Sequence, residues 1–419
     1  MHHFGLICPP AASHVTGLAA IGRVLLRHGH RATLFNILDT AVLAEREQIP
    51  FHPLGQAAHP SGSFRGFSEK MAQLEGLAAL RFGLRVAASE IGMLLEEAPD
   101  ALADAGVSAL LVDQGQPAGS TLAESLNIPF FTICNAPPVN YHPSVPPTST
   151  GWMPGNSYVT RLRNRLFHRA LNLGIRPLRH QINDYRRRRG LRPLVSLEST
   201  GSPWVQLSQQ TRDFDFPNPG LPEHFHYIGL LHRLSSSSVP FPFEQLSSRP
   251  LVYATFGTIL KGKQEVFHTL AEVCAKLDAE FVISLGGRGR ASDHPGLPGR
   301  VMVVEYAPQL ELLKRSSLTI CHAGNNTVLE SLSYGVPVLA IPVWGDQPGV
   351  AARLVHSGAG ERISLGKLRY EPLLRLCRQL LEQPSYRERA RQIASSIENA
   401  GGEVRAAEII ESVLSRIGN

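Results

Sequence analysis

Residues 321–348 read CHAGNNTVLESLSYGVPVLAIPVWGDQP, and the alternation of strand and helix patterns in this stretch indicates the fold class. An apolar run that begins at Leu318 ends here, a helix is expected over 326–334, and the apolar run PVLAIPV follows it. Two strands joined by a helix favour a parallel sheet, because neighbouring parallel strands need a crossover connection. The sequence therefore predicts an α/β structure, with small hydrogen-bonding residues gathered where the first strand meets the helix.

The same alternation extends over both halves of the chain. In the second half we expect strands over 250–257, 280–287 and 301–306 and helices over 263–277 and 308–315. In the first half we expect strands over 3–10, 31–37, 109–114 and 129–136 and helices over 16–28 and 119–127. A chain of 419 residues is too long for one ordinary core. The pattern therefore predicts two Rossmann-like, doubly wound domains.

Shifts in composition give the expected limits of these domains. The first domain is expected over 1–213 and the second over 249–398, and an amphipathic helix over 399–419 ends the chain. The intervening range 214–248 is rich in Pro and Ser and is interpreted as a linker.

The composition favours a globular protein of a reducing compartment. Hydrophobic residues make up 43% of the chain and charged residues 18%, so large cores can form. The five cysteines (8, 134, 274, 321 and 377) contain no C-x-x-C pair. No run of 18 apolar residues occurs, and the start MHHFGLICPPAASHVTG lacks a charged region followed by a sustained apolar one. We therefore expect a cytoplasmic protein.

The net charge of +6 is concentrated in one segment, which we call the Arg-rich segment. Residues 160–193 contain eleven Arg and a single acid, Asp184. Two interpretations stay open: a solvated surface helix, or a patch that contacts the anionic inner face of a membrane. Nucleic acid is disfavoured as a partner, because no recognition motif accompanies the charge. The apolar residues that alternate with the Arg are Leu162, Leu166, Phe167, Leu171 and Leu173.

A His and an Asp stand at the ends of two strands in the first half. His14 lies in the loop CPPAASHVTG, which contains no G-x-G-x-x-G, so a dinucleotide cofactor is not expected there. Asp113 ends the strand ALLVD. Side chains at the carboxyl ends of parallel strands can meet, and an Asp that fixes the tautomer of a His makes it a competent general base. The alternative is that His14 only caps a helix.

The loop FGTILKGKQ, residues 256–264, matches the G-x-x-x-x-G-K part of the phosphate-binding loop motif. Gln264 stands where the magnesium-ligating Ser or Thr must be, so an ATPase is excluded. The turn at Gly257 and Thr258 can still donate N–H and hydroxyl groups to phosphate. A simple tight turn is the alternative interpretation.

The strand-to-helix junction within residues 321–348 has the features of a diphosphate site. Gly324 lets the chain turn closely, and Asn326 and Thr327 begin a helix whose free N–H groups carry partial positive charge. His322 adds a donor, and Glu330, one turn further on, can accept both hydroxyls of a ribose. The alternative, a routine helix cap, leaves four polar residues without a role: His322, Glu330, Asp346 and Gln347.

Two stretches carry a resemblance to a known family. YAPQLELL (306–313) and HAGNNTVLESLSYGVPVLAIPVWGDQ (322–347) resemble the nucleotide-sugar signature of family 1 glycosyltransferases, which runs from Trp-x-Pro-Gln to a final Asp or Glu with Gln. FGLICPPAASHVTGL (4–18) and VDQGQPAGSTLAESLNIPF (112–130) are similar to segments of bacterial zeaxanthin (carotenoid) glucosyltransferases. The resemblance covers nearly the whole chain. It implies the GT-B fold, in which the acceptor binds the N-terminal domain and the nucleotide sugar binds the C-terminal domain across a cleft.

The resemblance also implies roles for individual residues. Tyr306 stands where the family has the Trp that stacks on uracil, Ala307 bonds the base through its backbone, and Gln309 lies near the nucleoside. His14 matches the catalytic base and Asp113 its partner. The remaining donor contacts fall to Gly257, Thr258, Gly324 and Asn325, to His322, Asn326 and Thr327 at the diphosphate, to Glu330 at the ribose, and to Asp346 with Gln347 at the hexose.

The implied reaction is an inverting transfer of a hexose, expected to be glucose, from a UDP-sugar to a hydroxyl of a lipophilic molecule such as a carotenoid. Phenolic or flavonoid acceptors are the alternative, and the acceptor-shaping segments are expected around 55–95 and 137–160. Helix dipoles and a His replace the cation of other glycosyltransferases, so no metal or other cofactor is expected. The chain departs from the family pattern at three places, which bear on base selectivity. Tyr306 replaces the stacking Trp, Asn325 replaces a Trp common in plant members, and two residues are missing between Gln309 and His322.

Two other functions compete with inverting glycosyl transfer from a UDP-sugar. A metal-dependent GT-A transferase would need a D-x-D motif, which Asp213 and Asp215 supply, but this pair precedes the linker, away from the nucleotide residues. A non-catalytic carrier of lipophilic ligands would not need His14 and Asp113 together.

Overall fold

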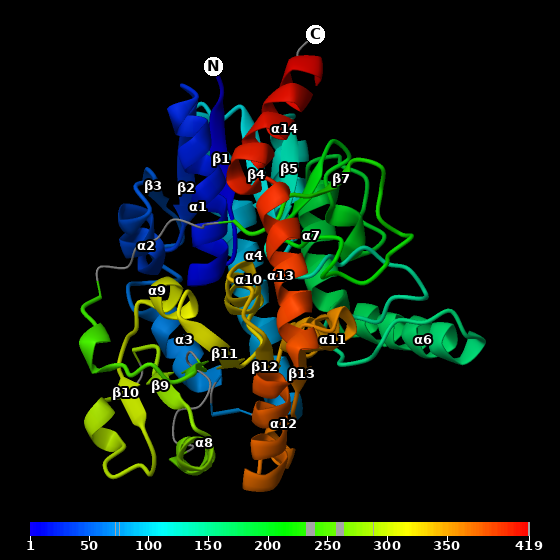
Figure 1. Ribbon diagram of the computed structural model, residues 1–419. Helices are drawn as coiled ribbons and strands as arrows, with labels where there is room; N and C mark the ends of the chain where they lie inside the picture. Colours follow the sequence, from blue (N-terminus) through cyan, green and yellow to red (C-terminus); the bar gives the residue numbers. More distant parts are fainter. Residues whose placement is uncertain (72, 75, 232–238, 257–263, 288, 418–419) are drawn as a thin grey trace.

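The computed structural model describes residues 1–71, 73–74, 76–231, 239–256, 264–287 and 289–417 (Figure 1). Within these residues the first sheet has seven strands in the order β3-β2-β1-β4-β5-β6-β7, and every neighbouring pair is parallel. The strands are β1 His3–Ile7, β2 Arg31–Asn36, β3 Phe51–Pro53, β4 Ala109–Asp113, β5 Phe130–Cys134, β6 Gln206–Ser208 and β7 Phe225–Tyr227. β1, β4 and β5 are buried along their whole length, as expected for a parallel sheet covered on both faces.

Helices cover both faces of this sheet. The helices of this unit are α1 Ala12–Arg27, α2 Ala41–Arg46, α3 Ser63–Met71, α4 Gly76–Asp104, α5 Ala118–Leu126, α6 Tyr158–Gly174 and α7 Arg176–Arg188, with 3-10 turns η1 Leu38–Thr40 and η2 Leu197–Thr200. The range 55–95, expected as acceptor-shaping loops, is mostly helical, because α3 and α4 occupy it. Residues 137–157 contain no regular helix or strand and pass from β5 to α6.

The second sheet has the same parallel character. In the described residues its order is β10-β9-β8-β11-β12-β13. Its strands are β8 Leu251–Thr255, β9 Glu280–Ser284, β10 Val301–Val304, β11 Ser316–Cys321, β12 Val338–Ala340 and β13 Gly360–Arg362. Its helices are α8 Gln264–Lys276, α9 Gln309–Leu313, α10 Asn325–Ser333, α11 Gln347–Ser357, α12 Tyr370–Glu382 and α13 Pro384–Asn399, with η3 Phe243–Gln245, η4 Ala291–Asp293 and η5 Leu365–Lys367. Two doubly wound α/β units are therefore present, as the sequence predicts.

The last helix, α14 Gly402–Ile417, returns to the first unit instead of standing apart. It packs on α1, and Ala406, Ile410 and Leu414 join the core cluster that contains Val15. Glu411 accepts hydrogen bonds from the rings of His28 and His30 at 2.9 and 3.1 Å. The two chain ends lie on the same side of the molecule (Figure 1).

The expected linker is partly a strand. β7 lies inside the range 214–248 and pairs with β6, so the first sheet extends further along the chain than the expected limit at 213. Three-residue strands such as β3, β6 and β7 are too short to show an alternation of apolar and polar residues. Pro and Gly around β7 also favour a loop interpretation.

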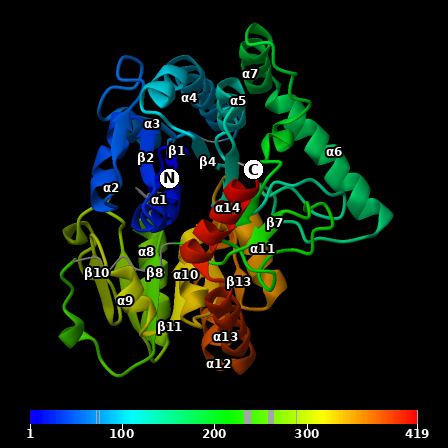
Figure 2. The same ribbon diagram turned by 90° about the horizontal axis from the view of Figure 1, so that it is seen from above.

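The Arg-rich segment forms α6 and α7. α7 packs on α4 and α5, whereas α6 projects from the body of the first unit (Figures 1 and 2). Arg186 of α7 is only 3% exposed, and its Nη2 lies 2.6 Å from Oε2 of Glu124. Arg186 therefore belongs to the core and not to the expected membrane patch. The sequence did not indicate this, because Glu124 lies 62 residues earlier, on α5.

Candidate active site

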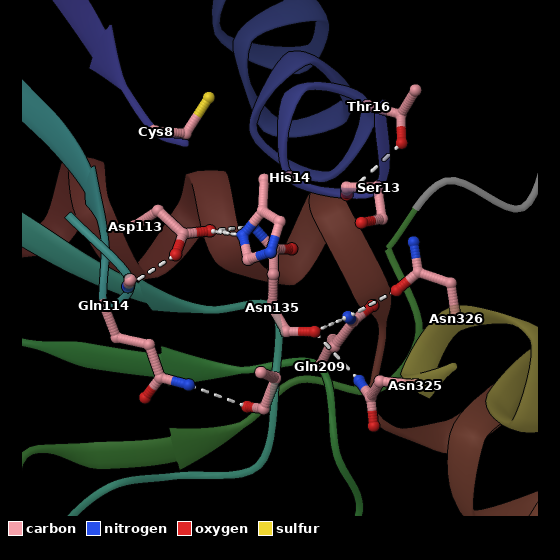
Figure 3. A network of polar contacts seen from close by, with 12 residues as sticks. Cys8, Ser13, His14, Thr16, Asp113, Gln114, Asn135, Gln209, Asn325 and Asn326 are labelled. Carbon is pink, nitrogen blue, oxygen red and sulfur yellow. Dashed lines mark hydrogen bonds and ion pairs between the residues drawn. The ribbon is translucent and has the colours of Figure 1, made fainter. Parts of the chain in front are cut away.

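His14 and Asp113 meet at the carboxyl edge of the first sheet (Figure 3). β1 and β4 are parallel neighbours, so the helix after β1 begins beside the end of β4. Nδ1 of His14 lies 2.8 Å from Oδ2 of Asp113; the Asp side chain is fully buried and the His side chain is 23% exposed. The Asp carboxylate holds the proton of the neutral imidazole on Nδ1. Nε2 is left as a proton acceptor.

Charges around His14 favour its protonated form. Burial lowers the pKa of His14, but the Asp113 carboxylate, with Asp346 and Glu90 nearby, outweighs this and raises the pKa above its ordinary value. Asp113 is held by two further donors: the Gly115 N–H at 2.7 Å from Oδ1 and the Asn135 Nδ2 at 2.6 Å from Oδ2. The arrangement is that of a general base with an orienting carboxylate.

An apolar cavity of about 320 Å³ opens beside this pair. Its walls come from α4, from the loops after β4 and β5, and from α6 and α7; they include Glu90, Ile91, Gly115, Val139, Leu171 and Ile175. Gly115 links the cavity to the pair, because a Cβ added to it would lie 3.8 Å from Cε1 of His14. Glu90 is a carboxyl in this wall, and burial raises its pKa to about 7.

The strand-to-helix junction quoted at the outset lies at the start of α10. Ala323 adopts a positive φ of 63°, a strained conformation for a residue with a Cβ. A Cβ on Gly324 would lie 2.7 Å from Nε2 of His322, so only Gly leaves room for this imidazole. Burial lowers the pKa of His322 to about 4, which the backbone of Thr255 partly offsets. His322 is therefore neutral at physiological pH.

Glu330 and Gln309 are joined at the next turn of α10. Nε2 of Gln309 donates to Oε2 of Glu330, and the hydroxyl of Tyr253 donates to Oε1 of Gln309 at 3.1 Å. Burial raises the pKa of Glu330 to about 7, while the Gln309 hydrogen bond works against that rise. These groups come from the middle of β8, the start of α9 and the second turn of α10, and together they form a polar wall suited to hydroxyls.

Tyr306 and Ala307 lie at the end of β10. Tyr306 is 60% exposed, and its hydroxyl lies close to Gly287, where an added Cβ would be 1.9 Å away. Its ring therefore stands at the open edge of the second sheet, as a stacking residue would. Ala307 is half-buried behind it. The structure brings together the residues assigned to the base and ribose, and their roles stay predictions.

Several other predicted donor residues face protein groups. Asn325 and Asn326 contact Gln210 and Gln209 of the first unit, at 2.7 and 2.8 Å. Oε1 of Gln347 accepts the N–H groups of Val343 and Trp344 at 2.9 and 3.2 Å. Burial raises the pKa of Asp346, which precedes α11, and Thr327 lies half-buried in the first turn of α10. Gly257 and Thr258 lie outside the described residues.

The D-x-D pair of the GT-A rival has another partner. Oδ1 of Asp215 lies 2.5 Å from Nε of Arg353, both side chains are 2% exposed, and Tyr227 donates to Oδ2 at 2.9 Å. Asp213 is exposed. Asp215 thus joins the first unit to α11 of the second, and its oxygens are already occupied. No group of three metal-ligating side chains occurs among residues that the structure describes.

Some residues of the site carried no recognisable signal in the sequence. Glu90 lies in an apolar helix pattern, and Asn135, Gln209 and Gln210 follow short strands. For Asn135, Gln209 and Gln210, the position after a strand was the one available hint, since ligand sites of such sheets lie there.

Comparisons with known proteins identify the family of this chain. The sequence profile of the UDP-glucoronosyl and UDP-glucosyl transferase family matches residues 10–399. The zeaxanthin glucosyltransferase of Pantoea ananas is 34% identical, covering 99% of this chain and 96% of that protein. The zeaxanthin glucosyltransferase of Pseudescherichia vulneris is 32% identical, covering 99% and 98%.

Solved structures support the fold. The kitacinnamycin glycotransferase superimposes with a TM-score of 0.79 at 20% identity, covering 98% of both chains. The calicheamicin glycosyltransferase CalG4 superimposes with a TM-score of 0.75 at 19% identity over the whole of both chains. The expected GT-B arrangement of two Rossmann-like units is confirmed. The chain is a UDP-dependent glycosyltransferase and belongs to the UDP-glucoronosyl and UDP-glucosyl transferase family.

Proposed function

We propose that this enzyme transfers glucose from UDP-glucose to a hydroxyl of a carotenoid such as zeaxanthin. The observation that carries the proposal is the apolar cavity whose wall at Gly115 adjoins His14 and Asp113. Each end ring of zeaxanthin is apolar and bears a single hydroxyl, so such a cavity would hold the ring while the hydroxyl faces the base. The names of the two zeaxanthin glucosyltransferases support the same acceptor.

The reaction is a direct displacement at the anomeric carbon. Nε2 of His14 takes the proton of the acceptor hydroxyl, and the oxygen attacks the carbon as the bond to the diphosphate oxygen breaks. The Asp113 carboxylate stabilises the imidazolium that forms, and UDP leaves with the electron pair of the broken bond. Attack from the opposite face converts an α-linked donor into a β-glycoside.

The leaving diphosphate needs a positive environment, and the start of α10 supplies one without a metal. Free N–H groups of the first turn and the neutral His322 ring can donate to phosphate oxygens. Turnover is therefore expected to persist in EDTA.

The exposed side of α6 fits an anionic membrane surface. Leu162, Leu166 and Leu173 share one face of the helix and are 38, 54 and 68% exposed, with Arg165 and Arg169 exposed beside them. The opposite face, with Leu171 and Ile175, lines the cavity. A lipophilic acceptor could then pass from the bilayer into the cavity beside the same helix. We infer peripheral contact with the inner face of a membrane, through α6. Among the described residues, none of the helices is long and apolar enough to cross a membrane.

An acceptor screen tests the main proposal. The purified enzyme is given UDP-glucose with zeaxanthin, a sterol or a flavonol, and product is followed by chromatography. A kcat/KM for zeaxanthin at least tenfold above the others supports the proposal. Preference for the flavonol would favour the phenolic alternative. UDP-glucose binding without any product would favour a carrier.

Liposome sedimentation tests the membrane contact. Replacing Arg161, Arg165 and Arg169 with Gln removes roughly 1 kcal/mol per charge near an anionic surface, so binding should fall about 100-fold. The matched control replaces exposed arginines of other helices with Gln: Arg375, Arg378 and Arg405. Equal binding by the two variants would leave α6 as a solvated helix.

A further inference from the structure

A chain of hydrogen bonds connects the base of the first unit to the start of α10 in the second (Figure 3). At one end, Nδ2 of Asn135 donates to Oδ2 of Asp113 at 2.6 Å. In the middle, the backbone carbonyl of Asn135 accepts from Nε2 of Gln209 and, at 2.9 Å, from Nδ2 of Asn325. At the other end, the same Gln209 nitrogen donates to Oδ1 of Asn326 at 2.8 Å.

The two fixed acceptors in this chain determine which way each amide faces. A carboxylate and a backbone carbonyl can only accept, so the Asn135 side chain must turn its nitrogen to Asp113 and Gln209 must turn its nitrogen to Asn135. The Gln209 nitrogen then also donates to Asn326, so Asn326 must accept this hydrogen bond with Oδ1. The Nδ2 of Asn326 is consequently left on the side away from Gln209, as Figure 3 shows.

We propose that Asn135 and Gln209 are positioning residues of the transfer reaction, one for the base and one for the diphosphate. This inference rests on the proposed roles of His14 and Asp113. Asn135 holds the Asp113 carboxylate so that Oδ2 also faces His14. Gln209 sets the Asn326 amide so that it donates to a phosphate oxygen at the start of α10.

The space around Asn135 is shaped for its side chain. A Cβ on Gly17 of α1 would lie 2.1 Å from Oδ1 of Asn135, so Gly leaves the room that the amide occupies. Asn135 is 4% exposed and Gln209 1% exposed, so water does not compete strongly for these hydrogen bonds. Both residues lie at the seam between the two units.

The two positions should respond differently to substitution. Asn135→Leu keeps the branched shape but removes the donor to Asp113, while the backbone carbonyl stays. The carboxylate then loses one of its restraints, and kcat should fall roughly 10- to 100-fold, as for a misplaced catalytic group. The Kd for UDP should stay within about twofold, because Gln209 and Asn326 keep their partners.

Gln209→Glu is the complementary variant. A carboxylate at this position can only accept, so Asn326 must turn its nitrogen toward residue 209 and its oxygen toward the phosphate. The Kd for UDP should rise about tenfold or more, and kcat at saturating donor should change less than the Kd does.

Matched controls make the same chemical changes outside the chain of hydrogen bonds. Gln206→Glu lies on β6, where Gln206 contacts Ser202 and Asn140, and Asn183→Leu lies on α7, where Asn183 bonds only the Leu194 backbone among the described residues. Both should keep wild-type UDP affinity and turnover. Thermal melting shows whether each variant is folded.

Steady-state kinetics with calorimetric UDP titration decide the matter. The expected split is lower kcat in Asn135→Leu and weaker UDP binding in Gln209→Glu. A wild-type kcat in Asn135→Leu would overturn the positioning role of Asn135. If His14→Ala is inactive in the same assay, His14 still stands as the proposed base. If Asn135→Leu and Gln209→Glu each lose both kcat and UDP affinity, and the two control variants lose as much, the role of Asn135 and Gln209 is purely structural. An active His14→Ala would overturn the proposed base itself.

Discussion

Burial acts in opposite directions on the acid and the base of the donor site. It raises the pKa of Glu330 to about 7 and lowers that of His322 to about 4. The neutral His322 and the partly protonated Glu330 are both poorly solvated, so each can gain from hydrogen bonds to a polar ligand. Hydroxyls of a ribose and oxygens of a diphosphate would supply those partners, so the site is less stable empty than filled.

Glu330→Gln should therefore be more stable than the wild type at high pH. The unfolded carboxyl titrates near 4.5 and the folded one near 7, so the folded state binds more protons and stability falls as pH rises from about 4.5 to 7. Gln does not titrate. At pH 8 the variant should gain on the order of 1 to 3 kcal/mol over the wild type, and nothing at pH 4.

Urea unfolding at the two pH values measures this difference, and donor kinetics measure its functional cost. Gln cannot accept both ribose hydroxyls as a carboxylate does, so the KM for UDP-glucose should rise. A wild-type KM would contradict the ribose role, and a variant less stable than the wild type at pH 8 would contradict the inferred burial of a charge.

At the scale of elements, strands within apolar runs were predictable, including the three-residue β12 in PVLAIPV, whereas β3, β6, β7 and the long helix α4 were not. β1, β4 and β8 are largely apolar runs of five residues, and β11 becomes apolar from Leu318; each was expected. β6 and β7 are stable because neighbours pair with them, a tertiary effect that a local pattern does not contain.

The junction between β11 and α10 yields an element-scale prediction. In Gly324→Ala the new Cβ would lie 2.7 Å from Nε2 of His322, so the imidazole must move. Loss of one hydrogen bond to a charged diphosphate is worth about 1.5 kcal/mol, and the Kd for UDP should rise about tenfold.

Gly366→Ala is the control for this variant, because its Cβ would meet no atom within 4 Å. Calorimetry should find wild-type UDP affinity in the control. Equal affinity in Gly324→Ala would show that the position of His322 does not matter for the diphosphate.

At the scale of the molecule, the two units are held together by contacts between distant segments. Asp215 pairs with Arg353 across 138 residues, and α14 returns to α1. Sequence patterns placed His14 and Asp113 at the carboxyl ends of two parallel strands, where side chains of such sheets can meet. The amides that join Asn135 to Asn326 could not be predicted, since they depend on how the two units pack.

Asp215 and Asp213 should behave as structural and surface residues, not as metal ligands. Asp215→Ala leaves the Arg353 cation buried without its partner, and the free energy of unfolding should fall by about 3 to 5 kcal/mol. Asp213→Ala should change stability by less than about 0.5 kcal/mol. Activity of the wild type should be equal with EDTA and with manganese. Activity lost in EDTA and restored by manganese would contradict the metal-free mechanism.

We propose that His14, oriented by Asp113, takes the proton of an acceptor hydroxyl that faces the UDP-sugar bound to the other unit. The direct test is kcat with UDP-glucose and zeaxanthin for His14→Ala, Asp113→Asn and the double variant, with UDP affinity measured alongside. The alcohol of zeaxanthin is weakly acidic and cannot ionise unaided. We predict that His14→Ala lowers kcat roughly 10²- to 10⁴-fold with UDP affinity unchanged, and that the double variant is little worse. Near-normal turnover in His14→Ala, or additive losses in the double variant, would contradict the account.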